Sequence, residues 1–145
     1  MKKPPEAIET ERLILRKPRM DDAAAMFAGW TQDTEVTRYL TWRPHERLEQ
    51  TQEFVRGCLS AWEGKTRFPY VITFKEIGEV IGMIDPRTES HKVGIGYGAA
   101  RAHWGKGYMT EALHAIIHWA FQQPSIYRVY ATTDVENLGS RRVME

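Results

Sequence analysis

The amino-acid sequence predicts a single domain of mixed α/β (α+β) class, in which a mixed sheet carries helices on its faces. Its 145 residues are 42% hydrophobic and 27% charged, which is enough apolar material for one packed core. Short β-branched runs alternate with stretches whose apolar residues recur every three or four positions. The resulting order, β-α-α-β-β-β-α-β-α, fits a mixed sheet flanked by helices. We expect one domain over residues 1–145.

The first half of the chain is predicted to contain one strand and two helices. Residues 12–17 alternate apolar and charged side chains, as a half-buried strand does, and Pro18 ends this strand. Residues 20–30 are rich in alanine and begin with two aspartates, which are good helix caps. The second helix is predicted over residues 46–63, and Gly64 is expected to end it.

The second half is predicted to contain a hairpin, another strand, a long helix, a last strand and the beginning of a further helix over residues 136–145. Residues 70–75 and 80–85 are β-branched runs joined by a short turn, and residues 92–98 form the next strand. Apolar residues then recur at spacings of three and four over 109–121, so one face of this helix is expected to pack on the sheet. Residues 127–135 read as a further strand.

Charge and composition limit the partners of this domain. Twenty Lys and Arg residues oppose 19 Asp and Glu residues, and a net charge of +1 gives no strong field toward nucleic acid or an anionic membrane. The sequence has no apolar run of membrane-spanning length, and its start lacks the apolar core of a signal peptide. We expect a cytoplasmic protein. Cys58, the only cysteine, lies on an apolar helical stripe and is interpreted as core.

A glycine turn that leads directly into a helix carries the most chemical information. Gly105, Lys106 and Gly107 stand between a predicted strand and a predicted helix. A helix start offers free N–H groups and a positive dipole end to a phosphate, and glycine removes Cβ atoms that would keep the anion away. The alternative is a turn that needs glycine only for its positive φ, and the spacing leaves both open. Neither a P-loop nor a dinucleotide-binding glycine motif fits this segment.

The strand before the turn has glycine at alternate positions: Gly94, Gly96 and Gly98. These glycines weaken a strand and leave one strip of its backbone bare. Such a strip suits the close approach of another extended chain or of a ligand that has amides of its own.

Three motifs together resemble those of the GNAT superfamily of N-acetyltransferases, and in particular its RimJ/RimL-like branch, which acetylates the N-termini of ribosomal proteins. They are TERLILR (10–16), VGIGYGAARAHWGKGYMTEAL (93–113) and NLGSRRVME (137–145), and they span nearly the whole chain. The resemblance implies the GNAT fold, a mixed central sheet with splayed strands flanked by helices. It also implies strands after Glu145, so the domain is expected to be C-terminally incomplete.

The resemblance implies acetyl-CoA as cofactor and assigns residues to it. The splayed strands would be 92–98 and 127–135, and the first would bond the pantetheine arm through Gly96, Tyr97 and Gly98. The pyrophosphate would bind the turn, whose residues are Trp104, Gly105, Lys106, Gly107, Tyr108 and Met109. Two positions depart from the general family pattern, which has a polar residue at Trp104 and a small one at Met109. Tryptophan at the first position is usual in the RimJ/RimL-like branch.

The segment after the last strand supplies the remaining predicted cofactor contacts and the catalytic candidates. By resemblance, Asn137 bonds the cofactor arm and Ser140 lies near the sulfur, where it would protonate the leaving thiolate; helix capping is the alternative for both. Attack on a thioester requires a neutral amine, so a base is needed. The splayed strand contains no carboxylate, which leaves Asp134 and Glu136 as the nearby acids.

The implied function is transfer of an acetyl group from acetyl-CoA to a primary amine by direct attack in a ternary complex. The acceptor is expected to be a protein N-terminus or a small-molecule amine, and the enzyme a monomer or a homodimer. Trp30, Tyr39 and Trp42 lie near the connection between the first two helices and are candidates for the acceptor pocket.

Two other classes of function stay open at this level. One is a non-catalytic acyl-CoA-binding module on the same fold, and the other is a plain nucleotide-binding domain, although no magnesium-binding acid stands beside the turn. No metal site is predicted, because His114 and His118 lack the glutamate of an H-E-x-x-H pattern.

Overall fold

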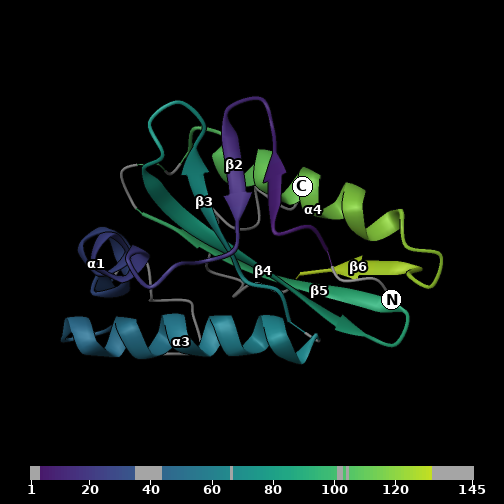
Figure 1. Ribbon diagram of the computed structural model, residues 1–145. Helices are drawn as coiled ribbons and strands as arrows, with labels where there is room; N and C mark the ends of the chain where they lie inside the picture. The colour runs from purple at the N-terminus through teal and green to yellow at the C-terminus, as the bar shows by residue number, and fades with distance from the viewer. Residues whose placement is uncertain (1–3, 35–43, 66, 101–102, 104, 132–145) are drawn as a thin grey trace.

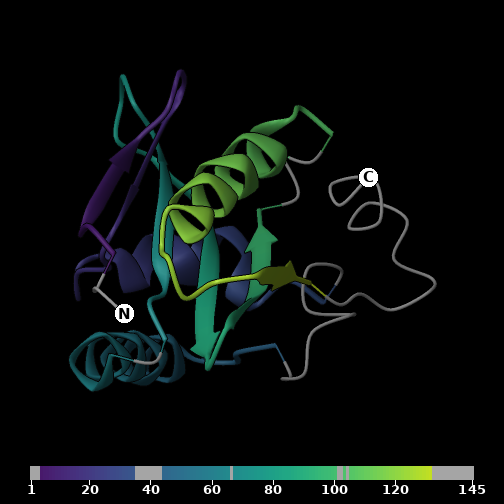
Figure 2. The same cartoon turned by 90° about the vertical axis from the view of Figure 1, so that its right-hand side faces the viewer.

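The computed structural model describes residues 4–34, 44–65, 67–100, 103 and 105–131. A six-stranded sheet in the order β1-β2-β3-β4-β5-β6 forms the centre of the molecule (Figure 1). Neighbouring strands are antiparallel except for β5 and β6, which are parallel. Figure 2 shows α4 in front of the sheet and α1 behind it, so the helices cover both faces.

The elements follow one another along the chain as β1 (Ala7–Glu9), β2 (Leu13–Arg16), α1 (Asp22–Met26), the π-helical turn η1 (Phe27–Thr31), α3 (Leu48–Gly64), β3 (Tyr70–Phe74), β4 (Val80–Glu89), β5 (Lys92–Ala99), α4 (Tyr108–Phe121) and β6 (Arg128–Tyr130). The mixed sheet with helices on its faces is therefore confirmed. Within the described ranges, every helix is too short or too polar to cross a bilayer.

Three details of the predicted elements are wrong. The first helix does not continue as an α-helix to residue 30, because a π-helical turn begins at Phe27. A Cβ built on Gly29 in this turn would lie 3.9 Å from the Cβ of Ala100, the residue after β5. Helix α3 includes Gly64, and Lys65 takes the left-handed turn after it with φ of 62°. The three-residue strand β1 was not predicted, since so short a run gives no periodic signal.

Two apolar clusters pack against opposite faces of the sheet. Ile84 and Ile116 belong to the cluster under α4, whereas Val55 and Met83 belong to the cluster that joins the sheet to α1, η1 and α3. Cys58 lies in the second cluster with 1% of its surface exposed, and burial raises the pKa of its thiol to about 12. This confirms that Cys58 is a core residue and not a reactive thiolate.

Candidate functional site

Strand β5 presents its glycines on the face that α3 covers. In the antiparallel register, Gly96 lies opposite Asp85 and Gly98 lies opposite Met83, a member of the α1–α3 cluster. Directly opposite residues of antiparallel strands point to the same face. A Cβ built on Gly96 or on Gly98 would meet no heavy atom of the described residues within 4 Å. The backbone of these two residues is therefore open, as the sequence predicted.

Gly94 differs from the other two strand glycines. A Cβ built on it would lie 2.8 Å from the hydroxyl oxygen of Tyr130 on strand β6. The open strip is therefore limited to Gly96 and Gly98. The described pairing of β5 with β6 runs only from Lys92 opposite Arg128 to Gly94 opposite Tyr130, at the first three residues of β5. Splaying of the two strands beyond this point stays a prediction.

The turn after β5 has a left-handed backbone at both of its glycines. The φ angle is 74° at Gly105 and 80° at Gly107, which directly precedes the first turn of α4. Glycine is the residue that tolerates this conformation without strain. The first backbone bond across this helix start runs from the Glu111 N–H to the Gly107 carbonyl at 3.0 Å, so the preceding N–H groups of the helix lack carbonyl partners within it. The turn thus needs glycine for folding and also offers donors to an anion.

A carboxylate on the first turn of α4 fastens this glycine turn to the β1–β2 connection. Glu111 accepts hydrogen bonds from the Thr10 hydroxyl, from the Arg12 N–H at 2.9 Å and from the Arg12 Nε at 2.7 Å. The Arg12 Nη1 donates to the Lys106 carbonyl at 3.3 Å, and its guanidinium lies 4.6 Å from the centre of the Tyr108 ring. Two motifs that are almost one hundred positions apart in the sequence therefore form one unit, which sequence reasoning missed.

The charge state of Glu111 follows from these contacts. Burial raises the pKa of its carboxyl, but the hydrogen bonds from Thr10 and Arg12, together with the positive charge of Arg12, outweigh burial and lower it. Glu111 is therefore ionised at neutral pH, and it completes an ion pair that holds the turn in place.

The structure tests only one of the three aromatic residues that were predicted to line the acceptor pocket. Trp30 is 2% exposed and packs in the α1–α3 cluster, so its side chain is a core element and presents almost no surface to an acceptor. Tyr39 and Trp42 lie outside the described residues. The same is true of further predicted site residues: Trp104, Asp134, Glu136, Asn137 and Ser140.

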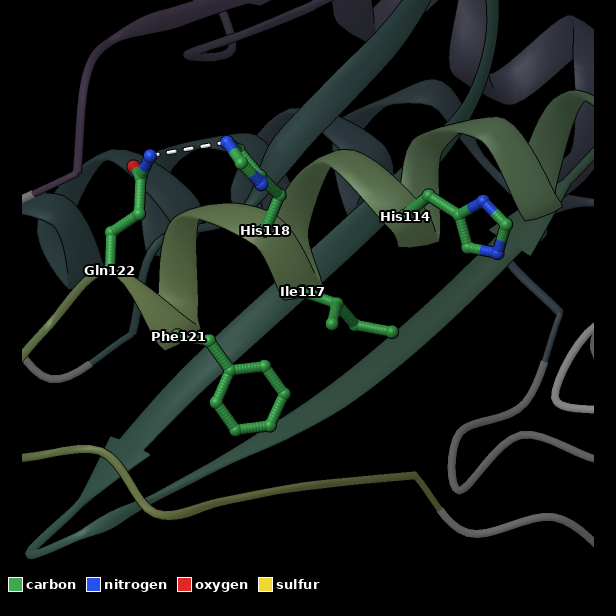
Figure 3. Close-up of a pocket in the computed structure, with 5 residues that line it drawn as sticks. All are labelled: His114, Ile117, His118, Phe121 and Gln122. Atoms are coloured by element: carbon green, nitrogen blue, oxygen red, sulfur yellow. Dashed lines mark hydrogen bonds between the residues drawn. The ribbon is translucent and has the colours of Figure 1, made fainter.

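An open hollow lies along α4. Figure 3 shows the side chains that line it, which are His114, Ile117, His118, Phe121 and Gln122. None of the predicted cofactor or acceptor residues that the structure describes lines this hollow. In the part of the chain that the structure describes, no three His, Cys, Asp or Glu side chains gather as metal ligands.

A comparison with protein families identifies the family of this chain. A family model described as "Acetyltransferase (GNAT) domain" matches residues 12–145. The chain belongs to this family. A relative from Bacillus licheniformis, the uncharacterized N-acetyltransferase p20, is 34% identical over 96% of this chain and 79% of its own length.

Solved structures agree with the assignment to the GNAT family. A GNAT-family acetyltransferase from Bacillus anthracis matches with a TM-score of 0.84 at 27% identity, covering 95% of this chain and 80% of that chain. RimL, a ribosomal L7/L12 α-N-protein acetyltransferase solved in complex with coenzyme A, has the same fold, with a TM-score of 0.83 at 21% identity over 95% of this chain and 80% of that chain. The GNAT fold and the RimL-like neighbours predicted from sequence are confirmed.

As a GNAT protein, the chain is an acetyltransferase, and its acetyl donor is acetyl-CoA. The described residues fit this donor in two places. The backbone at Gly96 and Gly98 is open to an extended chain, and the turn at Gly105 and Gly107 holds left-handed backbone in front of a 14-residue helix.

Proposed function

We propose that this acetyltransferase transfers the acetyl group to a primary amine that attacks the thioester directly, with both substrates bound at once. The observation that carries the proposal is the open backbone of Gly96 and Gly98 next to the glycine turn. An open strip beside an anion-binding helix start accommodates an extended phosphorylated thioester and leaves space for a second substrate. The relative p20 is named as an N-acetyltransferase, which supports an amine acceptor.

Residues of this chain hold the donor in the proposed complex. The backbone of Gly96, Tyr97 and Gly98 bonds the amides of the pantetheine arm, as a peptide bonds a sheet edge. The N–H groups near Tyr97 and Gly98 also face the developing oxyanion, which needs donors but no side chain. The pyrophosphate binds the amides of Gly105 and Gly107, and Lys106 adds a positive charge close to them.

The remainder of the turn and the segment after β6 complete the proposed donor site. Trp104, Tyr108 and Met109 belong to the turn by resemblance to the family motif. On the same ground, Asn137 bonds the arm, and Ser140 protonates the departing thiolate. Asp134 and Glu136 are the carboxylates that the sequence offers as proton acceptors. These assignments rest on the resemblance to the family.

The acceptor site is proposed to lie on the α3 side of β5, and Tyr39 and Trp42 stay candidates for it on the ground of sequence alone. We infer that the acceptor is a protein N-terminus or a small-molecule amine. RimL, whose fold this chain shares, is a ribosomal L7/L12 α-N-protein acetyltransferase. An α-amine has a reference pKa of about 8, well below that of a lysine amine, so it needs less help from a base at pH 7.

Acetyl transfer measured against a panel of amines tests the proposal. The panel contains a peptide with a free N-terminus, a polyamine, an aminoglycoside and free amino acids, and release of coenzyme A thiol reports turnover. We expect turnover with at least one amine, and a larger thermal stabilisation by coenzyme A than by ATP. Stabilisation by coenzyme A without transfer to any amine would identify an acyl-CoA-binding module. Stabilisation by ATP alone would identify a nucleotide-binding domain.

A further inference from the structure

Asp85 of strand β4 stands beside the open glycine strip. It lies opposite Gly96 in the β4–β5 register and therefore points to the same face of the sheet as the open position at Gly96. The neighbouring positions on that face are Met83 on β4 and Gly98 on β5. Asp85 is thus the carboxylate that the register places next to the proposed path of the thioester arm.

The two oxygens of the Asp85 carboxylate have different surroundings. Oδ2 accepts a hydrogen bond from Arg67 Nε at 2.7 Å and a longer one from Arg87 Nε at 3.4 Å. Oδ1 is buried and has no hydrogen-bond partner in the described part of the protein. A buried polar atom that lacks a donor costs free energy, and such atoms are rare in folded proteins. Oδ1 is therefore a position at which a ligand donor would be favoured.

The charged and titratable groups around Asp85 come from three elements. Among the described residues, Arg87 lies on β4, Arg67 lies on the segment between α3 and β3, and the Cys58 thiol of α3 interacts electrostatically with Asp85. Opposite Asp85, strand β5 contributes only the backbone of Gly96. Burial raises the pKa of the Asp85 carboxyl above its usual value, against the opposing effect of Arg67 and Arg87. A carboxylate with a raised pKa is a better proton acceptor.

We propose that Oδ1 of Asp85 contacts the nitrogen of the acceptor amine and removes a proton from it before the attack. This role rests on the proposed function, because it assumes an amine acceptor beside the glycine strip. Arg67 and Arg87 hold the other oxygen, so the carboxylate keeps a fixed orientation while Oδ1 accepts the proton. Asp85 then takes the place of a carboxylate on the splayed strand, where this chain has glycine.

The step conserves atoms and charge. The protonated amine gives one proton to Oδ1 of Asp85, and the electron pair that this frees forms a C–N bond to the thioester carbonyl carbon. The C–S bond then breaks, and its electron pair leaves with the sulfur. The nitrogen loses one further proton, which ends on the sulfur as the free thiol. Asp85 returns its own proton to water.

The test compares wild type with Asp85→Asn, using the best acceptor from the amine panel. At pH 7 we expect kcat/KM for the amine to fall about 100-fold, whereas the Kd for coenzyme A stays within about twofold. The deficit should shrink as pH rises toward the pKa of the amine, by up to about tenfold per pH unit, because neutral amine is then present without a base. Asp85→Glu retains a carboxylate, and we expect it to keep the pH profile of the wild type.

Asp22→Asn is a matched control. Asp22 is 6% exposed and also pairs with an arginine, but both of its oxygens have partners, which are Arg16 and the Arg19 N–H. We expect this variant to lose thermal stability and to show no pH-dependent deficit in kcat/KM.

Four results would contradict the role of Asp85. A deficit in Asp85→Asn that is equal at every pH would indicate a structural carboxylate. Unchanged kcat/KM in Asp85→Asn, together with a pH-dependent loss in Glu136→Gln, would assign the proton to Glu136. Wild-type protein that acetylates no amine would refute the proposed function and this role with it, whereas normal transfer by both proteins would refute this role alone.

Discussion

The glycines of strand β5 and those of the turn that follows it are close in sequence but serve different purposes. At Gly105 and Gly107 the backbone is left-handed, with φ angles of 74° and 80°, so the turn needs glycine in order to fold. At Gly96 and Gly98 φ is not positive, and an added Cβ would have no atom of the described part of the chain within 4 Å. Folding does not require glycine at these two strand positions. A glycine that the fold does not need indicates backbone that is kept open for a ligand.

Substitutions at the turn glycines and at the strand glycines therefore have different effects. The first strain the backbone, and the second only fill space. A side chain at Gly107 strains the backbone and also approaches Arg12, whose Nη2 would lie 3.5 Å from the new Cβ. A side chain at Gly96 strains nothing and only occupies space. Gly107→Val and Gly96→Ala use this difference, and Glu111→Gln disturbs the same turn with a smaller expected effect.

Gly107→Val should weaken coenzyme A binding at least tenfold. A β-branched residue is poorly tolerated at φ of 80°, at a cost of about 1–3 kcal/mol in stability, and its Cβ shields the turn amides from the pyrophosphate. Isothermal titration calorimetry measures the affinity, and thermal unfolding measures the strain.

Gly78→Val is the control for Gly107→Val. Gly78 has φ of 71°, lies in the β3–β4 hairpin and has nothing within 4 Å of an added Cβ. Both variants should lose stability to a similar degree, and only Gly107→Val should lose affinity. Equal affinity in the two variants would mean that the glycine turn has no part in binding.

Gly96→Ala should reduce kcat/KM for acetyl-CoA about fivefold without loss of stability. The new methyl group enters open space in the folded protein, and the smaller entropy of the unfolded chain favours folding by about 0.4–1 kcal/mol. In the proposed complex, the same methyl group occupies the path of the pantetheine arm. Steady-state kinetics and thermal unfolding of one preparation measure both effects.

Gly57→Ala provides the matched control on helix α3. Gly57 is exposed and also has nothing within 4 Å of an added Cβ, so alanine should stabilise the helix and leave kinetics unchanged. If Gly96→Ala behaves like Gly57→Ala in both measurements, the glycine strip of β5 does not hold the donor.

Local patterns predicted much of this fold because its elements are periodic over their own length. The alternation in Leu13–Arg16, the hairpin of β3 and β4 and the apolar face of α4 are all confirmed. Trp30 is different, because its position beside a loop suggested a pocket and only tertiary packing showed that it is core. Local sequence does not reveal which neighbours bury a side chain.

The site could be predicted only where its residues are neighbours in sequence. Gly105 and Gly107 form one visible motif, whereas Glu111 and Arg12 meet across 99 positions, and neither residue alone signals the contact. Asp85 became a candidate only after the register set it opposite Gly96. Strand register is a tertiary property, since it depends on which faces of the strands are buried.

The smallest expected effect concerns the contacts of Glu111 with Thr10 and Arg12. These contacts hold the glycine turn in place but do not lie in the path of the ligand. Glu111→Gln keeps the shape of the side chain but removes its charge, so the bonds from Thr10 and Arg12 weaken and the turn is held less firmly. We expect about a twofold loss of coenzyme A affinity and a lower Tm at pH 7. Glu53→Gln is the control, because Glu53 is 73% exposed in its ion pair with Arg56 and should change neither quantity.

The pH dependence of stability tests the cause of this effect. The folded protein lowers the pKa of Glu111, so the carboxylate contributes stability above its unfolded pKa of about 4.3, and this stability is lost as pH falls through the lower folded value. The difference in Tm between wild type and Glu111→Gln should therefore be full at pH 7 and should shrink below about pH 4. A Tm difference that is constant from pH 7 to pH 3 would show that Glu111 acts through packing. In that case the ion pair with Arg12 would not hold the turn, and the twofold change in affinity would need another source.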